Sequence, residues 1–180
     1  MEESGRISRF SAGRFHRDET LAGSTSKRVI IRRFERETLQ GFVNPQTYLC
    51  PGGIELLSQS GAIQMVPYNE VKIAYFVRDF GLPEPPPEHR LFNTRPKTNG
   101  VWVRMRLRDG ELMDGILPND LLQLEPLGFT LVPPSPSPNN QKMFVPRTAL
   151  SEVQVLGVVG SPLRPHKEKP KAKEQIGLFD

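Results

Sequence analysis

The chain has 180 residues, 37% of them hydrophobic, and a formal net charge of +4, so it fits one ordinary domain or two small ones and is only mildly basic. Its 18 prolines and 15 glycines argue against long helices. No run approaches the roughly 20 apolar residues of a membrane helix, and Cys50 is the only cysteine, which together predict a cytoplasmic protein without membrane contacts or disulfides.

The first half of the chain predicts a disordered arm followed by a small β-unit. Residues 1–26 are polar and rich in glycine and serine, which is typical of disorder. Residues 27–80 contain an apolar strand, a second strand that ends at Gly41, and a last strand after Val66-Pro67. We therefore expect a compact unit made of short strands.

The second half repeats this order. Residues 81–99 are rich in proline and predict an extended linker. Residues 100–160 contain an alternating strand, a second strand that ends at Gly115, and a last strand after another Val-Pro step. Residues 161–180 form a basic tail with three prolines, for which we expect disorder.

Local patterns support a duplicated all-β architecture. Residues 101–107 alternate between apolar side chains and arginine or tryptophan, as a half-buried strand does. Asp109-Gly110 then supplies the glycine that a tight hairpin requires. Only one short helical turn is expected, over residues 121–122 behind an Asn-Asp cap. A repeated small β-unit without a visible catalytic set indicates binding rather than chemistry.

The first unit resembles the Sm-like family, and the bacterial RNA chaperone Hfq in particular. The matching stretches are Thr38-Leu39-Gln40-Gly41 and Ile63-Gln64-Met65-Val66. Sm-like units are strongly bent five-stranded barrels, often assembled into rings that bind RNA. The resemblance therefore implies two tandem SH3/Sm-like small barrels with disordered N- and C-terminal tails. Oligomerisation is open, because a tandem chain can instead pair its two barrels internally.

The chain departs from the Hfq pattern at the RNA pocket. Hfq carries Tyr-Lys-His after the Met-Val strand, whereas this chain has Tyr68-Asn69-Glu70. Two further resemblances are short. Residues 71–80 resemble a bacterial family of uncharacterised domains that share a lysine, an aromatic-rich strand and Arg-Asp-Phe. The arginines at 28 and 32 resemble the arm of the cyclic-dinucleotide receptors (PilZ), but the Asp/Asn-x-Ser-x-x-Gly turn of that family is missing.

The C-terminal peptide resembles the bacterial sliding-clamp-binding motif, whose pattern is Gln, an aliphatic residue, a small residue, Leu and Phe. The corresponding residues are Gln175, Ile176, Gly177, Leu178 and Phe179. The resemblance implies that Gln175 enters a polar slot and that Leu178 and Phe179 enter an apolar cleft of the clamp. The alternative is a disordered end with an accidental apolar pair.

Two basic strand faces are candidate nucleic-acid platforms. One contains Trp102, Arg104, Arg106 and Arg108, and the comparable cluster in the first unit contains Arg28, Arg32 and Arg33. An indole can stack on a base while guanidinium groups bind phosphate. The alternative, which is the more common outcome for such a strand, is a solvated face whose arginine stems cover apolar surface.

No residue set for catalysis, metal binding or a cofactor is apparent. The three histidines fall in predicted arms or linkers, and no Gly-x-Ser-x-Gly stretch occurs. The working hypothesis is a non-enzymatic bacterial adaptor that binds RNA, DNA or protein through its two barrels and docks on the DNA sliding clamp through its tail. The alternatives are an Sm/Hfq-type RNA-binding post-transcriptional regulator, and a structural or oligomeric scaffold that binds no nucleic acid.

Overall fold

The computed structural model describes residues 26–81, 90–134 and 139–160, which form eleven β-strands and two 3₁₀ turns. The strands are β1 (Lys27–Arg33), β2 (Leu39–Val43), β3 (Leu49–Cys50), β4 (Gly53–Ser58), β5 (Ile63–Val66), β6 (Val71–Val77), β7 (Gly100–Leu107), β8 (Leu112–Leu117), β9 (Gly128–Leu131), β10 (Asn140–Pro146) and β11 (Leu150–Val159); the 3₁₀ turns are η2 (Leu121–Gln123) and η3 (Arg147–Ala149). The all-β prediction is confirmed, and the expected short helical turn is η2.

The first unit is an antiparallel meander whose first strand also pairs with its last. β1 pairs with β2 on one side and with β6 on the other, and β4 pairs with β2 and with β5. The resulting order is β6-β1-β2-β4-β5, with the two-residue strand β3 added beside β4. Alternating apolar residues place one face of these strands in a core, which includes Val29, Ile31 and Leu56.

The second unit has the same order and the same register. β7 pairs with β8 and β11, β9 pairs with β10, and two backbone hydrogen bonds between Ile116 and Val132 join β8 to the end of β9. Val103 lies opposite Gly115, as Val29 lies opposite Gly41 in the first unit. The pairing of the last strand with the first shifts register at the same place in both units, and β11 has a second shift between Val155 and Gly157. The two halves are therefore structural repeats.

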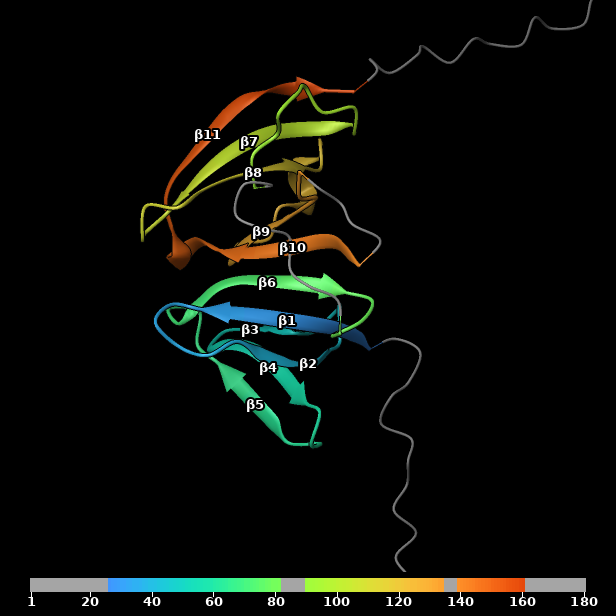
Figure 1. Cartoon of the computed structure of the whole chain (residues 1–180), viewed down its shortest axis with the longest axis vertical. Helices are drawn as coiled ribbons and strands as arrows, with labels where there is room; N and C mark the ends of the chain where they lie inside the picture. The colour runs from blue at the N-terminus through green and yellow to red at the C-terminus, as the bar shows by residue number, and fades with distance from the viewer. Residues whose placement is uncertain (1–25, 82–89, 135–138, 161–180) are drawn as a thin grey trace, which may run out of the picture.

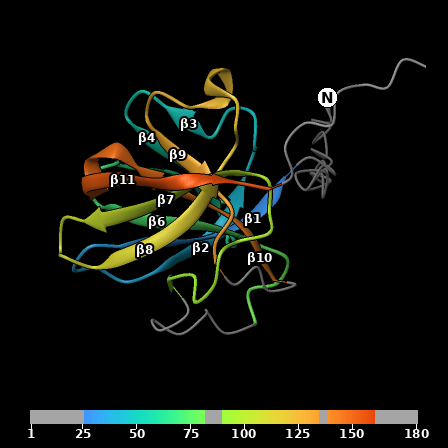
Figure 2. The same ribbon diagram turned by 90° about the horizontal axis from the view of Figure 1, so that it is seen from above.

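The two units are joined by strand pairing within one chain. β6, the last strand of the first unit, pairs antiparallel with β10, the fourth strand of the second unit, with Ala74 opposite Phe144. The strands consequently form one continuous stack from β11 through β10 and β6 to β5 (Figure 1). Seen from above, strands of the second unit overlie those of the first (Figure 2). Internal pairing, which the tandem sequence had left open, is the arrangement adopted.

The hydrophobic cores of the two units are shared across this junction. Ile30, Ile73 and Tyr75 belong to the first unit in sequence, but they pack in the core of the second. Phe144 comes from the second unit and is fully buried in the core of the first. Because each core needs side chains from the other half, we expect the described part of the chain to fold as one cooperative body.

Polar contacts reinforce the same junction. The ammonium group of Lys72 on β6 is buried and donates to Asp109 at 2.5 Å and to Glu111 at 2.6 Å, both in the β7–β8 hairpin. Arg108 lies 3.8 Å above the ring of Phe34 in the first unit. The described part of the predicted linker, residues 90–99, also packs on the second unit, where Pro96 is buried.

Candidate ligand pocket between the two units

A pocket of about 580 Å³ opens where β1 and β6 of the first unit approach β9 and β10 of the second. This volume is in the range of pockets that hold small ligands, roughly 300–1,000 Å³. Its lining combines an aromatic wall, one carboxylate and three cationic side chains. The pocket depends on the pairing of β6 with β10, since neither unit supplies all of these groups.

The carboxylate belongs to Glu125, in the loop before β9. Its Oε1 accepts a hydrogen bond from the hydroxyl of Thr130 at 3.1 Å. Its Oε2 is buried and has no hydrogen-bond partner among the described residues. Burial raises the pKa of Glu125, and the hydrogen bond from Thr130 opposes this rise. A buried acceptor without a donor costs free energy, so this atom is an unfavourable feature of the fold that the described residues do not relieve.

The aromatic wall is held in place by ring contacts. Tyr48 packs edge-on against Phe76 at 5.6 Å and against Phe144 at 5.9 Å between ring centroids. Burial, and then the nearby carboxylate of Glu125, raise the pKa of Tyr48 well above its ordinary value. Tyr48 is therefore a neutral phenol, and together with Phe76 it offers a rigid apolar surface to the pocket.

The three cations are Lys27 at the start of β1, Arg78 after β6 and Lys142 on β10. None of them forms a salt bridge with a carboxylate within residues 26–81, 90–134 and 139–160. The side chain of Asn139 ties this rim together, because its Oδ1 accepts hydrogen bonds from the backbone N–H groups of Arg78 and Asp79 at 2.9 and 2.7 Å. The rim is thus positively charged, and Asn139 fixes the backbone at Arg78.

The arrangement of these groups suits the binding of a small ligand. It offers a carboxyl group, two aromatic rings that meet edge-on and positive charge, which suit a ligand with a hydrogen-bond donor, a ring and an anionic group. Among the described residues no group of three or more His, Cys, Asp or Glu side chains could hold a metal ion.

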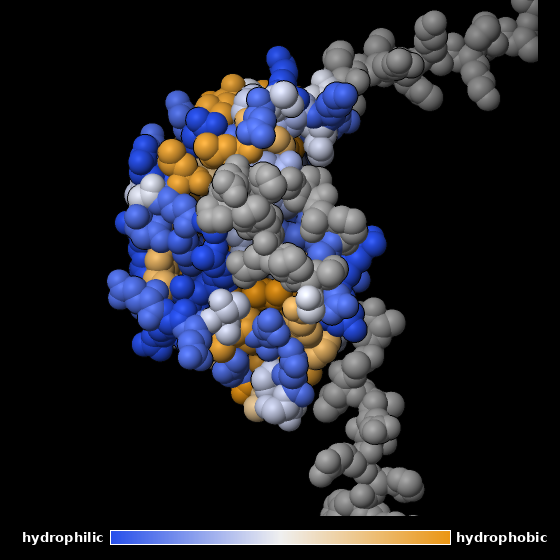
Figure 3. Space-filling view, in the orientation of Figure 1, coloured by the Kyte–Doolittle hydropathy of each residue, from blue (hydrophilic) through white to orange (hydrophobic). Residues whose placement is uncertain are grey.

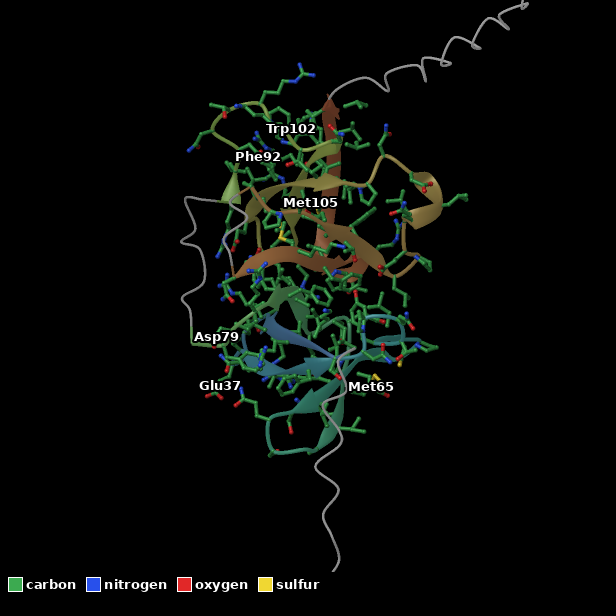
Figure 4. The ribbon with its side chains drawn as sticks, turned by 90° about the vertical axis from the view of Figure 1, so that its right-hand side faces the viewer. Glu37, Met65, Asp79, Phe92, Trp102 and Met105 are labelled. Atoms are coloured by element: carbon green, nitrogen blue, oxygen red, sulfur yellow. The ribbon has the colours of Figure 1, made fainter. Side chains whose placement is uncertain are left out.

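The predicted basic face on β7 is used for contacts inside the protein. Asp114 on β8 is fully buried and accepts two hydrogen bonds from Arg104, at 2.7 and 3.0 Å, and one from the indole N–H of Trp102 at 3.3 Å. The hydrogen bond to Asp114 raises the pKa of Arg104. Phe92 covers the indole edge-on at 5.8 Å, and the two rings lie together in Figure 4. These side chains fasten residues 90–99 to the sheet.

The other predicted basic residues are spread over separate surroundings. Arg106 lies 3.4 Å from Glu152 on the surface, and Arg108 donates to the backbone oxygen of Asn69 at 2.6 Å. In the first unit, Arg28 donates to the backbone oxygen of Arg78, Arg33 lies 3.4 Å from Glu70, and Arg32 is half-buried on β1. None of the residues of the two predicted clusters lines the pocket.

Sequence reasoning did not find the pocket residues as a set. Glu125 lies in a loop without a motif, and Lys142 is one lysine of a strand. Only the pairing of β6 with β10 places them together. The candidate clamp-binding residues Gln175, Ile176, Leu178 and Phe179 lie outside the described residues.

Comparison with known proteins places the chain in a family. No helix of the described residues is long and apolar enough to cross a membrane. No curated protein and no solved structure matches the chain. The model of one family, a family of unknown function designated DUF6982, matches residues 25–157, which is more than half of the chain. The chain therefore belongs to the DUF6982 family.

Proposed function

We propose that this protein is a non-enzymatic binding protein for single-stranded nucleic acid, and that the pocket between its two units receives one base and the adjoining backbone. The observation that carries this proposal is one pocket whose lining brings together the carboxyl group of Glu125, an aromatic wall and three cations. A nucleotide offers the three matching groups: an amino donor, a planar ring and a phosphate.

The chemistry of the pocket favours bases that carry an exocyclic amino group. The amino group of cytosine or adenine donates to a carboxylate oxygen, and carboxylates pair with cytosine in this way elsewhere. Uracil offers only an N–H flanked by two carbonyl oxygens, which the carboxylate of Glu125 repels. Phosphates on either side of the base come within the field of Lys27, Arg78 and Lys142.

The strand order also supports a nucleic-acid-binding barrel of the Sm-like kind. Each unit has the order last-first-second-third-fourth among its five main strands, which is the order that the resemblance to Hfq implies. The pocket, however, uses a carboxylate and the junction of two repeats. We therefore propose the RNA-binding interpretation for the pocket and not for the face of Trp102 and Arg104, whose polar groups are paired with Asp114.

Glu125→Gln is expected to weaken binding of cytosine- or adenine-rich single strands by about 10- to 100-fold, which corresponds to the roughly 1.5–3 kcal/mol of a hydrogen bond to a charged group. The preference over oligouridine should be lost at the same time. Fluorescence anisotropy with labelled RNA and DNA oligomers of each base measures both effects.

Glu55→Gln is the matched control, because it makes the same chemical change on the exposed face of β4, away from the pocket. It should leave the affinities unchanged. If all three cations contact phosphate, the wild-type affinity should fall with log salt at a slope of about −2. Equal affinity of wild type and Glu125→Gln for every oligomer, or no binding at physiological salt, would refute the pocket as a nucleic-acid site and favour the scaffold alternative.

Docking on the DNA sliding clamp is a separate proposal that rests on the C-terminal peptide alone. Leu178→Ala with Phe179→Ala should abolish micromolar binding of the protein to a bacterial sliding clamp in calorimetry, because these two side chains would fill the apolar cleft. Glu174→Ala, just outside the motif, should bind like the wild type. If the wild-type protein gives no heat of binding, the peptide has no role at the clamp.

A further inference from the structure

The exposed apolar side chains of the described residues gather on two strands at opposite ends of the molecule. Of seven large hydrophobic side chains that are exposed, six lie on β5 or β11: Ile63, Met65, Val153, Val155, Leu156 and Val158. β5 and β11 end the stack of strands at its two poles (Figure 1), and apolar atoms are visible at the β11 pole (Figure 3). Met65 lies on the β5 side in Figure 4.

Each of these strands has a strand partner on one edge only, although Arg95 donates a hydrogen bond to the backbone oxygen of Val158 on β11 at 3.1 Å. β5 pairs only with β4, and β11 pairs only with β7. Neither β5 nor the stretch from Val153 to Val159 carries a charged residue or a proline. Unpaired edges without such protection readily accept another strand, so natural proteins usually cover or charge them. A partner strand on each edge would remove this exposure.

The internal junction shows what covers the equivalent strands. By strand order, β11 is the counterpart of β6, and β5 is the counterpart of β10. β6 and β10 pair with each other, and their residues are buried there: Ala74 and Phe144 are fully inaccessible. The chain thus contains one complete junction and the two unmatched halves of a second junction of the same kind.

We propose that copies of this chain assemble head to tail, with β11 of one copy pairing antiparallel with β5 of the next. In the internal junction, Ala74 lies opposite Phe144 and Phe76 lies opposite Lys142. The same register between β11 of one copy and β5 of the next gives the expected pairs. Val153 should lie opposite Met65, and Val155 opposite Ile63. Such a contact joins different surfaces of the two copies, so it propagates to a closed ring or to a filament.

The new junction differs in chemistry from the internal one. Lys27 and Lys142 lie at the rim of the pocket in the internal junction. In the contact between copies, the equivalent positions are Val101 in place of Lys27 and Ile63 in place of Lys142. The contact between copies would therefore be apolar and would not repeat the ligand pocket. Assembly is consequently independent of the proposed binding of nucleic acid, and either one can fail without the other.

The first test is the mass of the full-length protein in solution by light scattering coupled to size exclusion. Wild type should have a mass well above the 20.3 kDa of one chain. Val155→Lys, which places a charge on a side chain that is 64% exposed in the single chain, should reduce the mass to one chain while the far-UV circular dichroism spectrum stays that of the folded protein. Leu122→Lys is the control, because Leu122 is exposed but lies on neither edge, and it should assemble like wild type.

The second test determines the register of the proposed pairing between β11 and β5 by disulfide crosslinking, in chains that carry Cys50→Ser. Chains carrying Met65→Cys should crosslink to chains carrying Val153→Cys when the two are mixed and oxidised, and neither should crosslink alone. Gln154→Cys, one residue along, points to the opposite face and should not react with Met65→Cys. A monomeric wild type, or crosslinks of Val153→Cys with itself that indicate a symmetric β11–β11 dimer, would overturn the proposal.

Discussion

Asp114→Ala is expected to lower the free energy of unfolding by about 3–5 kcal/mol, the usual cost of removing one partner of a buried ion pair. The carboxylate is inaccessible to solvent and accepts hydrogen bonds from Arg104, Trp102 and the backbone N–H of Phe92. The lower part of this range is the more realistic, because the side chain of Arg104 is 34% exposed and can turn partly to water.

Urea unfolding followed by far-UV circular dichroism measures this change, and two variants calibrate it. Asp114→Asn keeps the shape but replaces one acceptor oxygen with a donor, so it should lose a large part of the same free energy. Glu152→Ala removes the carboxylate of the other ion pair on this sheet, in which both side chains are about half exposed, and should change stability by less than about 1 kcal/mol. Equal effects of Asp114→Ala and Glu152→Ala would show that Asp114 does not hold the sheet together.

The main strands of each unit were predictable because they follow from local signals. Alternation along residues 101–107 fixes which side chains face the core, and Val103, Met105 and Leu107 are indeed buried. The Asp109-Gly110 turn was also expected, and Gly110 has a φ of +85°. The first hairpin lacks a glycine at this turn; Glu35 adopts a φ of +53° there, which an L-residue reaches less readily.

The role of the basic face could not be predicted from alternation. Alternation shows that Trp102 and Arg104 point away from the core of residues 103 and 105, but it does not show what covers them. The covering groups are Asp114, which the sequence places near a turn, and Phe92, in a stretch that reads as a linker. Both contacts depend on tertiary packing. A strand whose outer face is open to solvent therefore has the same local sequence pattern as a strand whose outer face is covered by other residues.

The pocket and the junction needed the three-dimensional structure for a similar reason. Pairing of β6 with β10 joins residues about 70 positions apart, and such non-local pairing leaves no periodic mark on the sequence. Duplication made a junction conceivable, because two equal units can offer each other matching edges. Which edges meet is decided by the burial of Phe144 against the first unit and of Tyr75 against the second.

Phe144→Ala is expected to destabilise the whole described body by about 3–5 kcal/mol, as truncation of a buried phenylalanine does. Phe144 is fully buried, contacts Tyr48 edge-on, and belongs to a strand of the second unit while filling the core of the first. Phe144→Leu keeps most of the volume and should cost distinctly less. Urea unfolding of both variants gives the free energies.

Because Trp102 and Phe144 report on different units, the unfolding of Phe144→Ala also tests whether the two units share one core. Trp102 is the only tryptophan and lies in the second unit, whereas the cavity opens in the first. If the two units unfold as one body, the midpoint from Trp102 fluorescence shifts as far as the midpoint from far-UV circular dichroism, and the transitions coincide. A fluorescence midpoint that stays at the wild-type value while circular dichroism shows an earlier transition would mean that the units unfold separately. In that case strand pairing between β6 and β10 would be too weak to couple them, and the pocket formed between the units would exist only while both are folded and docked.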